Sequence, residues 1–488
     1  MKSLYLVLLL SIFACKQNSE ATTNISNVSH VSLDQSDGGT DPENSPVMGG
    51  PTDIKVELAE TSENGLVRII GFYNDQNFVA DTFRISGGKG RYTKKEGLPQ
   101  GLYYFMFPNQ EVLQIMLSED QEFSVKTSLK NIMPTAKFDG SDENTEMYKV
   151  FQYEEEINPK IQNAIDKMKN EKEGSPAFNA LRDERLALEK QKSDYIQAFY
   201  EKNPKSLFAS FKFGGQNPIV DPDKPKELQL MDYRGHFWDG VNFNDRRLLR
   251  TPIIGNKLKR YMKELVPQNQ DSIVKYAFEL TDKVVDKKEY FKVFANWIVL
   301  QYEPGKSSLM DAEAVFVNMV KKYFTSEKAF WSDSTQTSLI QKRAFEMEAS
   351  LLNKKGPNVL SVGPDGTKHE LYKMTADYVI VYMFNPDCEH CQEETPKLLQ
   401  YYHQNKGKID VFGIAVDTND EKWINYIHKL NLDWTNVYDP TNRTIYAKYF
   451  VDHTPEIYVL NKDRIIIGKN LKVEQIQTVI DRDKEKSK

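Results

Sequence analysis

Two cysteines that stand three positions apart are the residues of this chain best suited to chemistry. Cys388 and Cys391 are separated only by Glu389 and His390, and the one other cysteine among the 488 residues, Cys15, lies near the N-terminus. A dithiol at this spacing can close to a disulfide and open again, exchanging two electrons with another thiol pair. Since neither has a further cysteine nearby, the sequence predicts that the pair exchanges electrons.

Two other uses of a Cys-X-X-Cys pair fit the sequence less well. A structural zinc site normally has four ligands, and the chain has no second cysteine pair. His403 and His428 fall on separate predicted helical segments, at spacings that match no standard zinc finger. A structural disulfide that closes so short a loop would remove little entropy from the unfolded chain.

The pair lies where an apolar segment is followed by a helical one. Residues 378–384 form an apolar run typical of a buried strand, and the cysteines come directly after it. From about Pro357 onward, strand-like and helical segments alternate, which predicts a mixed sheet covered by helices on both faces. The further strands and the further helix are expected at 409–416, 421–430, 457–460 and 464–467.

This order, with Cys-X-X-Cys at the end of the first central strand, resembles the thioredoxin fold. Pro396, five residues after Cys391, matches the proline that kinks the active-site helix of thioredoxins. Thr454-Pro455 matches the family's cis-proline segment, which faces the dithiol and helps to bind the extended backbone of a substrate. Glu394 matches a glutamate near the dithiol in the TlpA/ResA branch of extracytoplasmic thiol-disulfide oxidoreductases.

The resemblance implies a role for each residue around the dithiol. Cys388, at a predicted helix start, is the exposed nucleophile, because the helix dipole and the free amide hydrogens stabilise a thiolate there. Cys391 lies one turn further in and resolves the mixed disulfide, and the matching residue of the family implies that Glu394 moves its proton. A simple exposed carboxylate is the alternative for Glu394. Protonated His390 favours the thiolate and Glu389 opposes it, so the direction of the thiol pKa shift stays open.

Three positions depart from the related families. Many relatives carry Trp directly before the first cysteine, where this chain has Asp387, so a different docking surface is expected. Tyr382 replaces the buried carboxylate of thioredoxin, which leaves more of the proton transfer to Glu394. A peroxidase of the related fold would need a threonine where this chain has Asn385.

The third cysteine closes a leader sequence. Lys2 is followed by an apolar stretch over 4–13, which has the length of a signal peptide and is too short to span a bilayer. The following Ala14-Cys15 resembles the lipobox of bacterial lipoproteins, in which the cysteine carries the lipid after cleavage. Several acyl chains would anchor the protein stably. We therefore expect lipidation of Cys15 and a periplasm-facing position in the bacterial cell envelope; an ordinary secretory leader is the alternative.

Composition and periodicity divide the chain into five parts. Small and polar residues follow the leader and predict a tether, short alternating segments then predict strands, and three- and four-residue spacings predict helices. The fold class is therefore multidomain, with a β-sandwich-like domain, an all-α domain and a C-terminal α/β thioredoxin-like domain. The predicted parts are a signal peptide over 1–15, a tether over 16–50, a β-rich domain over 51–140, a helical domain over 141–353 and the thioredoxin-like domain over 354–488.

These observations together predict a membrane-anchored extracytoplasmic thiol-disulfide oxidoreductase. Its partners are client proteins with disulfides or thiols and an upstream redox donor or acceptor, and reduction is the expected direction by resemblance alone. We expect no cofactor and no metal, and the net charge of −6 gives no reason to expect nucleic acid. The alternative is an envelope binding or assembly lipoprotein whose accessory domains carry the function and whose redox module is secondary.

Overall fold

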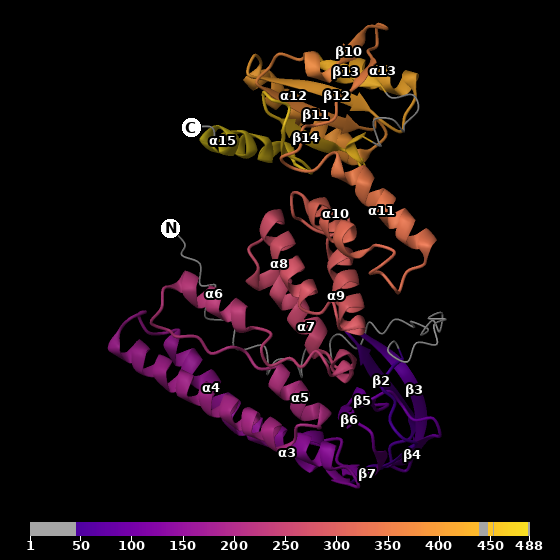
Figure 1. Cartoon of the computed structure of the whole chain (residues 1–488), viewed down its shortest axis with the longest axis vertical. Helices are drawn as coiled ribbons and strands as arrows, with labels where there is room; N and C mark the ends of the chain where they lie inside the picture. The colour runs from indigo at the N-terminus through magenta and orange to yellow at the C-terminus, as the bar shows by residue number, and fades with distance from the viewer. Residues whose placement is uncertain (1–44, 439–447, 452, 487–488) are drawn as a thin grey trace. The chain divides into compact units, whose positions relative to one another are not determined.

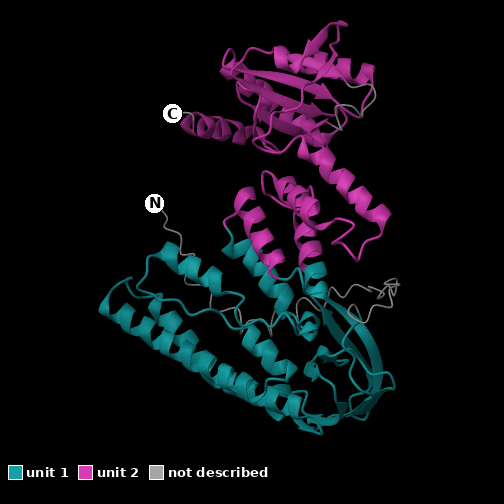
Figure 2. Ribbon diagram, in the orientation of Figure 1, with its two compact units in different colours: residues 1–266, 284–293 teal, residues 267–283, 294–488 magenta. Residues whose placement is uncertain are grey.

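The computed structural model describes residues 45–438, 448–451 and 453–486. The chain forms two compact units, shown in different colours in Figure 2: the first extends to residue 266 and includes 284–293, and the second comprises the remaining residues. A sheet followed by helices makes up most of the first unit, and helices followed by an α/β sheet make up the second (Figure 1). The predicted multidomain fold class is confirmed. Cys15 and the tether up to residue 44 lie outside the described residues.

The N-terminal sheet contains eight strands in the order β6-β5-β2-β3-β4-β1-β7-β8. Alternation of polar and apolar residues explains its strands: in β1 (Thr52–Leu58), Ile54 and Val56 are buried and Lys55 is exposed. The sequence predicted an antiparallel sandwich, whereas hydrogen bonds join these eight strands in one sheet and β1 pairs with β7 in parallel. The other strands are β2 (Gly65–Tyr73), β3 (Gln76–Ser86), β4 (Lys89–Lys94), β5 (Gly101–Met106), β6 (Val112–Leu117), β7 (Gln121–Thr127) and β8 (Lys137–Asp139).

Two long helices, α3 (Asp142–Met168) and α4 (Pro176–Lys202), lie side by side in the first unit (Figure 1). One face of α3 carries Ile157, Ile161 and Ile165, which recur every four residues. They form a small apolar core with Tyr153 of α3 and Leu188 of α4. The remaining helices of this unit are α2 (Ile132–Thr135), α5 (Leu207–Gly214), α6 (Lys226–His236), η2 (Arg246–Arg250), α7 (Ile253–Arg260) and η3 (Tyr261–Leu265).

The second unit begins with helices. These are α8 (Gln270–Asp282), the last part of α9 (Lys288–Gln301), α10 (Ala312–Tyr323) and α11 (Ser334–Glu348). α10 packs against α8 and α11. The helices of the predicted 141–353 domain are thus shared between the two units, and the predicted boundaries stay predictions. Within the described part of the chain, no helix combines the length and the apolar character that a membrane span requires.

A seven-stranded sheet, in the order β10-β9-β13-β12-β11-β14-β15, forms the C-terminal part of the second unit. Its central strand β11 is parallel to β12 and antiparallel to β14. The strands are β9 (Leu360–Val362), β10 (Lys368–Glu370), β11 (Tyr378–Phe384), β12 (Ile409–Ala415), β13 (Thr435–Tyr438), β14 (Glu456–Leu460) and β15 (Ile466–Gly468). The helical segments are η4 (Leu371–Lys373), α12 (Glu389–Asn405), α13 (Asp420–Leu430), η5 (Val473–Gln475) and α15 (Ile476–Lys486).

Each face of this sheet carries its own apolar core. Alternate residues of β11 point to opposite faces, as in any strand: Tyr382 and Phe384 belong to one core, and Val381 and Met383 belong to the other. The core around Tyr382 also contains Cys391 of α12. One face of the sheet therefore determines the surroundings of the buried sulfur.

Helix α10 is joined to the C-terminal sheet by a buried ion cluster, which consists of Lys469, Asp311 and Glu313. Lys469 Nζ lies 3.5 Å from Asp311 Oδ1 and 3.4 Å from Glu313 Oε2, and the three side chains are 2%, 1% and 8% exposed. The Asp311 carboxylate also accepts hydrogen bonds from the backbone N–H groups of Ala314 and Leu352. Because buried charges need such partners, the cluster fastens the start of α10 to the chain that follows β15.

Candidate dithiol site

The turn between β11 and α12 places the two cysteines at a helix N-terminus. β11 ends at Phe384 and α12 begins at Glu389, with Cys388 at the position that caps the helix. Asn385 stabilises the turn, because its side-chain oxygen accepts the backbone N–H of Asp387 at 2.8 Å and its side-chain nitrogen donates to the backbone carbonyl of Asp417 at 3.0 Å. Backbone N–H groups at a helix start have no partner within the helix, so they are available to a thiolate.

Cys388 is the accessible member of the pair. Its side chain is partly buried, and its thiol donates a hydrogen bond to the backbone carbonyl of Thr454 at 3.2 Å. Burial opposes ionisation of this thiol, but hydrogen bonds from the backbone N–H groups of Cys391 and His390 and from the Thr454 side chain outweigh it and lower the pKa of Cys388. The direction that the sequence left open is therefore downward.

Cys391 has the opposite surroundings. Its side chain is fully buried, and the backbone N–H of Asn385 lies 3.5 Å from its sulfur. Burial raises the pKa of Cys391 to about 12, because a thiolate there would lose its hydration. The two sulfurs of one motif thus differ sharply in how easily they ionise.

The structure brings the predicted substrate-binding segment to the dithiol. The peptide bond between Thr454 and Pro455 is cis, as the sequence predicted. It precedes β14, which pairs with β11, and this pairing sets the Thr454 carbonyl beside Cys388. Glu389 and His390, which were predicted to tune the thiols, are both exposed on the first turn of α12.

Glu394 is engaged with groups other than the sulfurs. Its carboxylate lies 2.6 Å from Lys397 Nζ and accepts the backbone N–H of Val473 at 3.3 Å. Partial burial favours the protonated form, but these two contacts outweigh it and lower the pKa of Glu394. The carboxylate therefore stabilises the start of η5 in its charged form, and its role in moving the proton of Cys391 stays a prediction.

Sequence reasoning missed the polar groups around Cys391. Thr395 and Tyr426 both donate hydrogen bonds to the Cys391 carbonyl, at 2.7 and 3.1 Å, and the Tyr382 hydroxyl lies 2.7 Å from that of Thr395. Tyr382 was identified only as a replacement for a carboxylate. Its partners on α12 and α13 are set by packing between elements, which periodicity does not report.

A buried acid beside the dithiol segment was also missed. Glu456 directly follows Pro455, is 2% exposed and has one carboxyl oxygen without a hydrogen bond among the described residues. Burial raises the pKa of Glu456 to about 8, although the nearby Lys469 favours the charged form. The signal in the sequence was a single acid opening the otherwise apolar run Ile457-Tyr458-Val459-Leu460.

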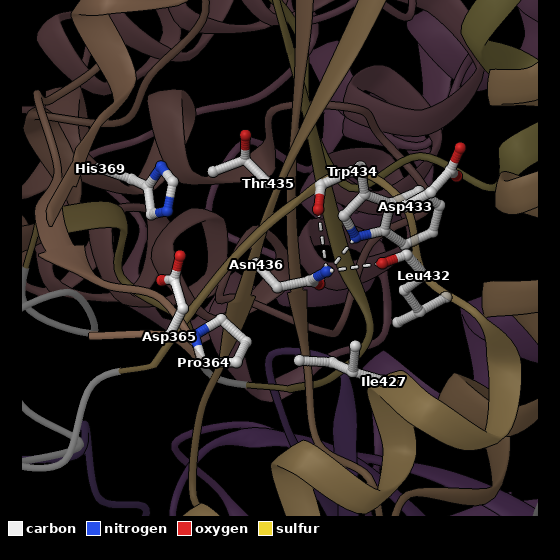
Figure 3. Close-up of a pocket in the computed structure, with 9 residues that line it drawn as sticks. All are labelled: Pro364, Asp365, His369, Ile427, Leu432, Asp433, Trp434, Thr435 and Asn436. Carbon is white, nitrogen blue, oxygen red and sulfur yellow. Dashed lines mark hydrogen bonds between the residues drawn. The ribbon is translucent and has the colours of Figure 1, made fainter. Parts of the chain in front are cut away.

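A hollow of about 390 Å³ lies elsewhere in this unit, at the start of β13 (Figure 3). Asn436 lines the hollow, and its side chain already has hydrogen-bond partners within the protein. Its side-chain nitrogen donates to the backbone carbonyls of Leu432 and Trp434, and its side-chain oxygen accepts the indole N–H of Trp434. Neither Cys388 nor Cys391 lines the hollow. Among the residues that the structure describes, no group of three or more His, Cys, Asp or Glu side chains is arranged to hold a metal ion.

Residues 375–466 match a family model described as thioredoxin-like. The matched segment contains β11, the dithiol, the cis Thr454-Pro455 bond and β14. This segment is a thioredoxin-like domain. The sulfur pair is thus at the start of α12 in a thioredoxin-like domain, and no curated protein matches the chain.

Solved structures similar to the chain include bacterial proteins with related names. A domain of a possible thiol-disulfide isomerase from Cytophaga hutchinsonii is 34% identical, covers 28% of this chain and 97% of its own, and has a TM-score of 0.27. A thioredoxin-like protein from Bacteroides caccae is 21% identical over 54% of this chain and 97% of its own, with a TM-score of 0.44. A secreted disulfide oxidoreductase from Mycobacterium tuberculosis is 19% identical over 25% of this chain and 95% of its own, with a TM-score of 0.24.

Proposed function

We propose that this protein is a thiol-disulfide oxidoreductase of the TlpA/ResA type, whose dithiol exchanges disulfides with client proteins. The observation that carries the proposal is the difference between the two sulfurs. Cys388 is accessible and has a lowered pKa, whereas Cys391 is buried and has a pKa of about 12. Capture of a client requires an accessible thiolate, and its release requires a second sulfur that is protected from outside reagents.

The proposed cycle transfers two electrons to the client. The Cys388 thiolate attacks one sulfur of the client disulfide, so that a mixed disulfide forms and the other client sulfur leaves as a thiolate that takes a proton from solvent. Cys391 then attacks Cys388, which forms the Cys388–Cys391 disulfide and releases the second client sulfur. The proton of Cys391 is taken up by that departing sulfur. An upstream dithiol then reduces the disulfide and restores the enzyme.

We also propose where in the cell the protein acts and in which direction it exchanges electrons with its clients. Cys15 would carry the lipid anchor, and the segment over 16–50 would let the domain reach clients on the periplasmic side of the cell envelope. Reduction of clients is the proposed direction, supported by the resemblance to the TlpA/ResA branch. The thiolate that Thr454 and the helix start favour is the form that begins a reductive cycle.

The proposal is tested by trapping the clients. When the full chain is expressed in its bacterial host, the Cys391→Ser variant should accumulate mixed disulfides between Cys388 and client proteins, and dithiothreitol should reduce them. The matched control, Cys388→Ser with Cys391→Ser, should accumulate none. If the single variant recovers no client from the envelope, the proposed redox role fails, and a binding or assembly role of the upstream domains becomes the better account.

A further inference from the structure

Three hydroxyl groups from three elements meet behind the buried sulfur, and we call them the hydroxyl cluster. They belong to Tyr382 of β11, Thr395 of α12 and Tyr426 of α13. The Thr395 hydroxyl lies 2.7 Å from that of Tyr382 and 2.8 Å from that of Tyr426, and both Thr395 and Tyr426 reach the backbone carbonyl of Cys391. The cluster thus connects the turn that carries Cys391 to the sheet and to the neighbouring helix.

The backbone alone holds this turn less firmly than an ordinary helical turn. Pro396 has no N–H, so the carbonyl of Gln392 lacks the hydrogen bond that a residue four positions later would normally donate. Thr395, directly before this proline, adds a side-chain hydrogen bond to the carbonyl of Cys391, which precedes Gln392 in the same turn. Because its hydroxyl proton goes to the Cys391 carbonyl, it accepts from Tyr382, and Tyr426 shares its single hydroxyl proton between the Thr395 hydroxyl and the Cys391 carbonyl.

The two tyrosines are held rigidly. The ring of Phe384 stacks on Tyr382 at 5.4 Å and on Tyr426 at 5.5 Å, measured between ring centroids. Tyr382 and Thr395 are fully buried, and Tyr426 is nearly so. Burial raises the pKa of Tyr426 to about 12 and also raises the pKa of Tyr382, so both phenols stay protonated and act as hydrogen-bond donors.

We propose that Thr395 and Tyr426 are positioning residues for the resolving step, a role that rests on the function proposed above. They hold the carbonyl of Cys391 from behind and so fix how closely its sulfur approaches Cys388. Attack on a client depends instead on Cys388, which is held by Thr454 and by the helix start. Loss of either hydroxyl should therefore slow release of the client and leave its capture unchanged.

The step concerned exchanges one bond for another. The bond between Cys388 and the client sulfur breaks, the Cys388–Cys391 bond forms, and the proton of Cys391 passes to the departing sulfur. The attacking sulfur must lie in line with the bond that breaks, so a displacement of about 1 Å lowers the rate by up to roughly a hundredfold. The hydroxyl cluster only positions Cys391, and none of its hydroxyl groups gains or loses a proton in this step.

The two steps can be measured in one experiment. The reduced full chain is mixed with excess 5,5′-dithiobis(2-nitrobenzoate), which releases one coloured thiolate on attack by Cys388 and a second when Cys391 resolves the mixed disulfide. Tyr426→Phe keeps the ring and Thr395→Val keeps the shape, so each removes only a hydroxyl. The control is Tyr401→Phe. Tyr401 lies on α12, as Thr395 does, but its hydroxyl bonds to Gln477 and not to the hydroxyl cluster.

We expect the second phase to slow by about tenfold to a hundredfold in Tyr426→Phe and Thr395→Val, with the first phase unchanged. Thr395→Ser restores the hydroxyl and should restore the second phase, whereas a role in general stability would slow both phases together. Wild-type resolution in both hydroxyl-deletion variants, or equal slowing of both phases, overturns the proposal. Failure of the proposed function itself looks different, because the unmodified chain would then release no rapid first thiolate.

Discussion

Lys469→Met is the substitution that tests most directly how the second unit is held together. Lys469 is the cation of the buried ion cluster, and its side chain is 2% exposed beside Asp311 and Glu313. Burial opposes its charge, but the carboxylates of Glu313, Asp311 and Glu456 outweigh burial and raise the pKa of Lys469. Methionine has a similar length and no charge, so the substitution removes the cation and leaves the packing.

The size of the effect follows from the geometry. At separations of 3.5 and 3.4 Å, each pair attracts by roughly 5 kcal/mol at an effective dielectric constant of about 20. Desolvation of the lysine offsets much of this attraction, so the expected loss is that of leaving buried carboxylates without a cation, about 3–5 kcal/mol. Such a loss is a large part of the roughly 5–15 kcal/mol that stabilises a typical domain.

The assay is urea unfolding of the full chain, with hydrogen exchange read from peptides that cover α10 and β14. Lys469→Met should unfold at lower urea and exchange faster in both elements. Adding Glu313→Gln should recover part of the loss, because Asp311 alone keeps its two backbone hydrogen bonds. Lys484→Met is the control: this lysine is half exposed, 3.7 Å from Asp481, and its removal should change little. An unchanged midpoint in Lys469→Met would refute the reasoning.

Three further experiments address the site. Iodoacetamide should alkylate Cys388 with a pH midpoint below 9.0, whereas burial should keep the midpoint of Cys391, tested in Cys388→Ser, above 9.0; equal midpoints would contradict the assignment. Burial raises the pKa of Glu456 from its ordinary 4.5 to about 8 in the folded chain, so the wild type loses stability as the pH rises between these two values. Glu456→Gln should therefore unfold at higher urea than the wild type, by a difference that grows across this pH window and then stays constant. A gain in stability that does not depend on pH would exclude this cause. Asp387 and Lys422 form an exposed ion pair 2.6 Å apart. At low salt, Asp387→Asn should raise the rate with anionic oxidised glutathione relative to the rate with cationic cystamine by about two- to fivefold, and Lys422→Gln should lower this ratio. An unchanged ratio in both variants would show that the pair does not influence the choice of client.

Local patterns in the sequence predicted the core of the fold well. The apolar run over 378–384 coincides with β11, and Thr454-Pro455 is cis beside the dithiol as expected. Both depend on short stretches of chain, where hydrophobic run length and residue type carry the information. The alternating segments at 101–107 and 112–117 likewise became strands β5 and β6.

Contacts between distant segments could not be predicted in this way. Glu394 binds Val473, which follows it by 79 positions, and Asn470 bonds to Glu313 across 157 positions. The sequence showed Glu394 three residues after Cys391 and suggested proton transfer, whereas its surroundings depend on how η5 packs against α12. The sign of the Cys388 pKa shift was open for the same reason, since it depends on hydrogen bonds that include one from Thr454.

The pairing of Cys388 with Thr454 also bears on the timing of synthesis. Thr454 follows the sulfur by 66 positions, so both thiols leave the ribosome long before the segment that completes their surroundings. Until β14 docks along β11, Cys388 lacks its neighbour at Thr454 and behaves more like an ordinary cysteine. Chains that end before Thr454 therefore carry the two cysteines without the hydrogen bond that this residue supplies to Cys388.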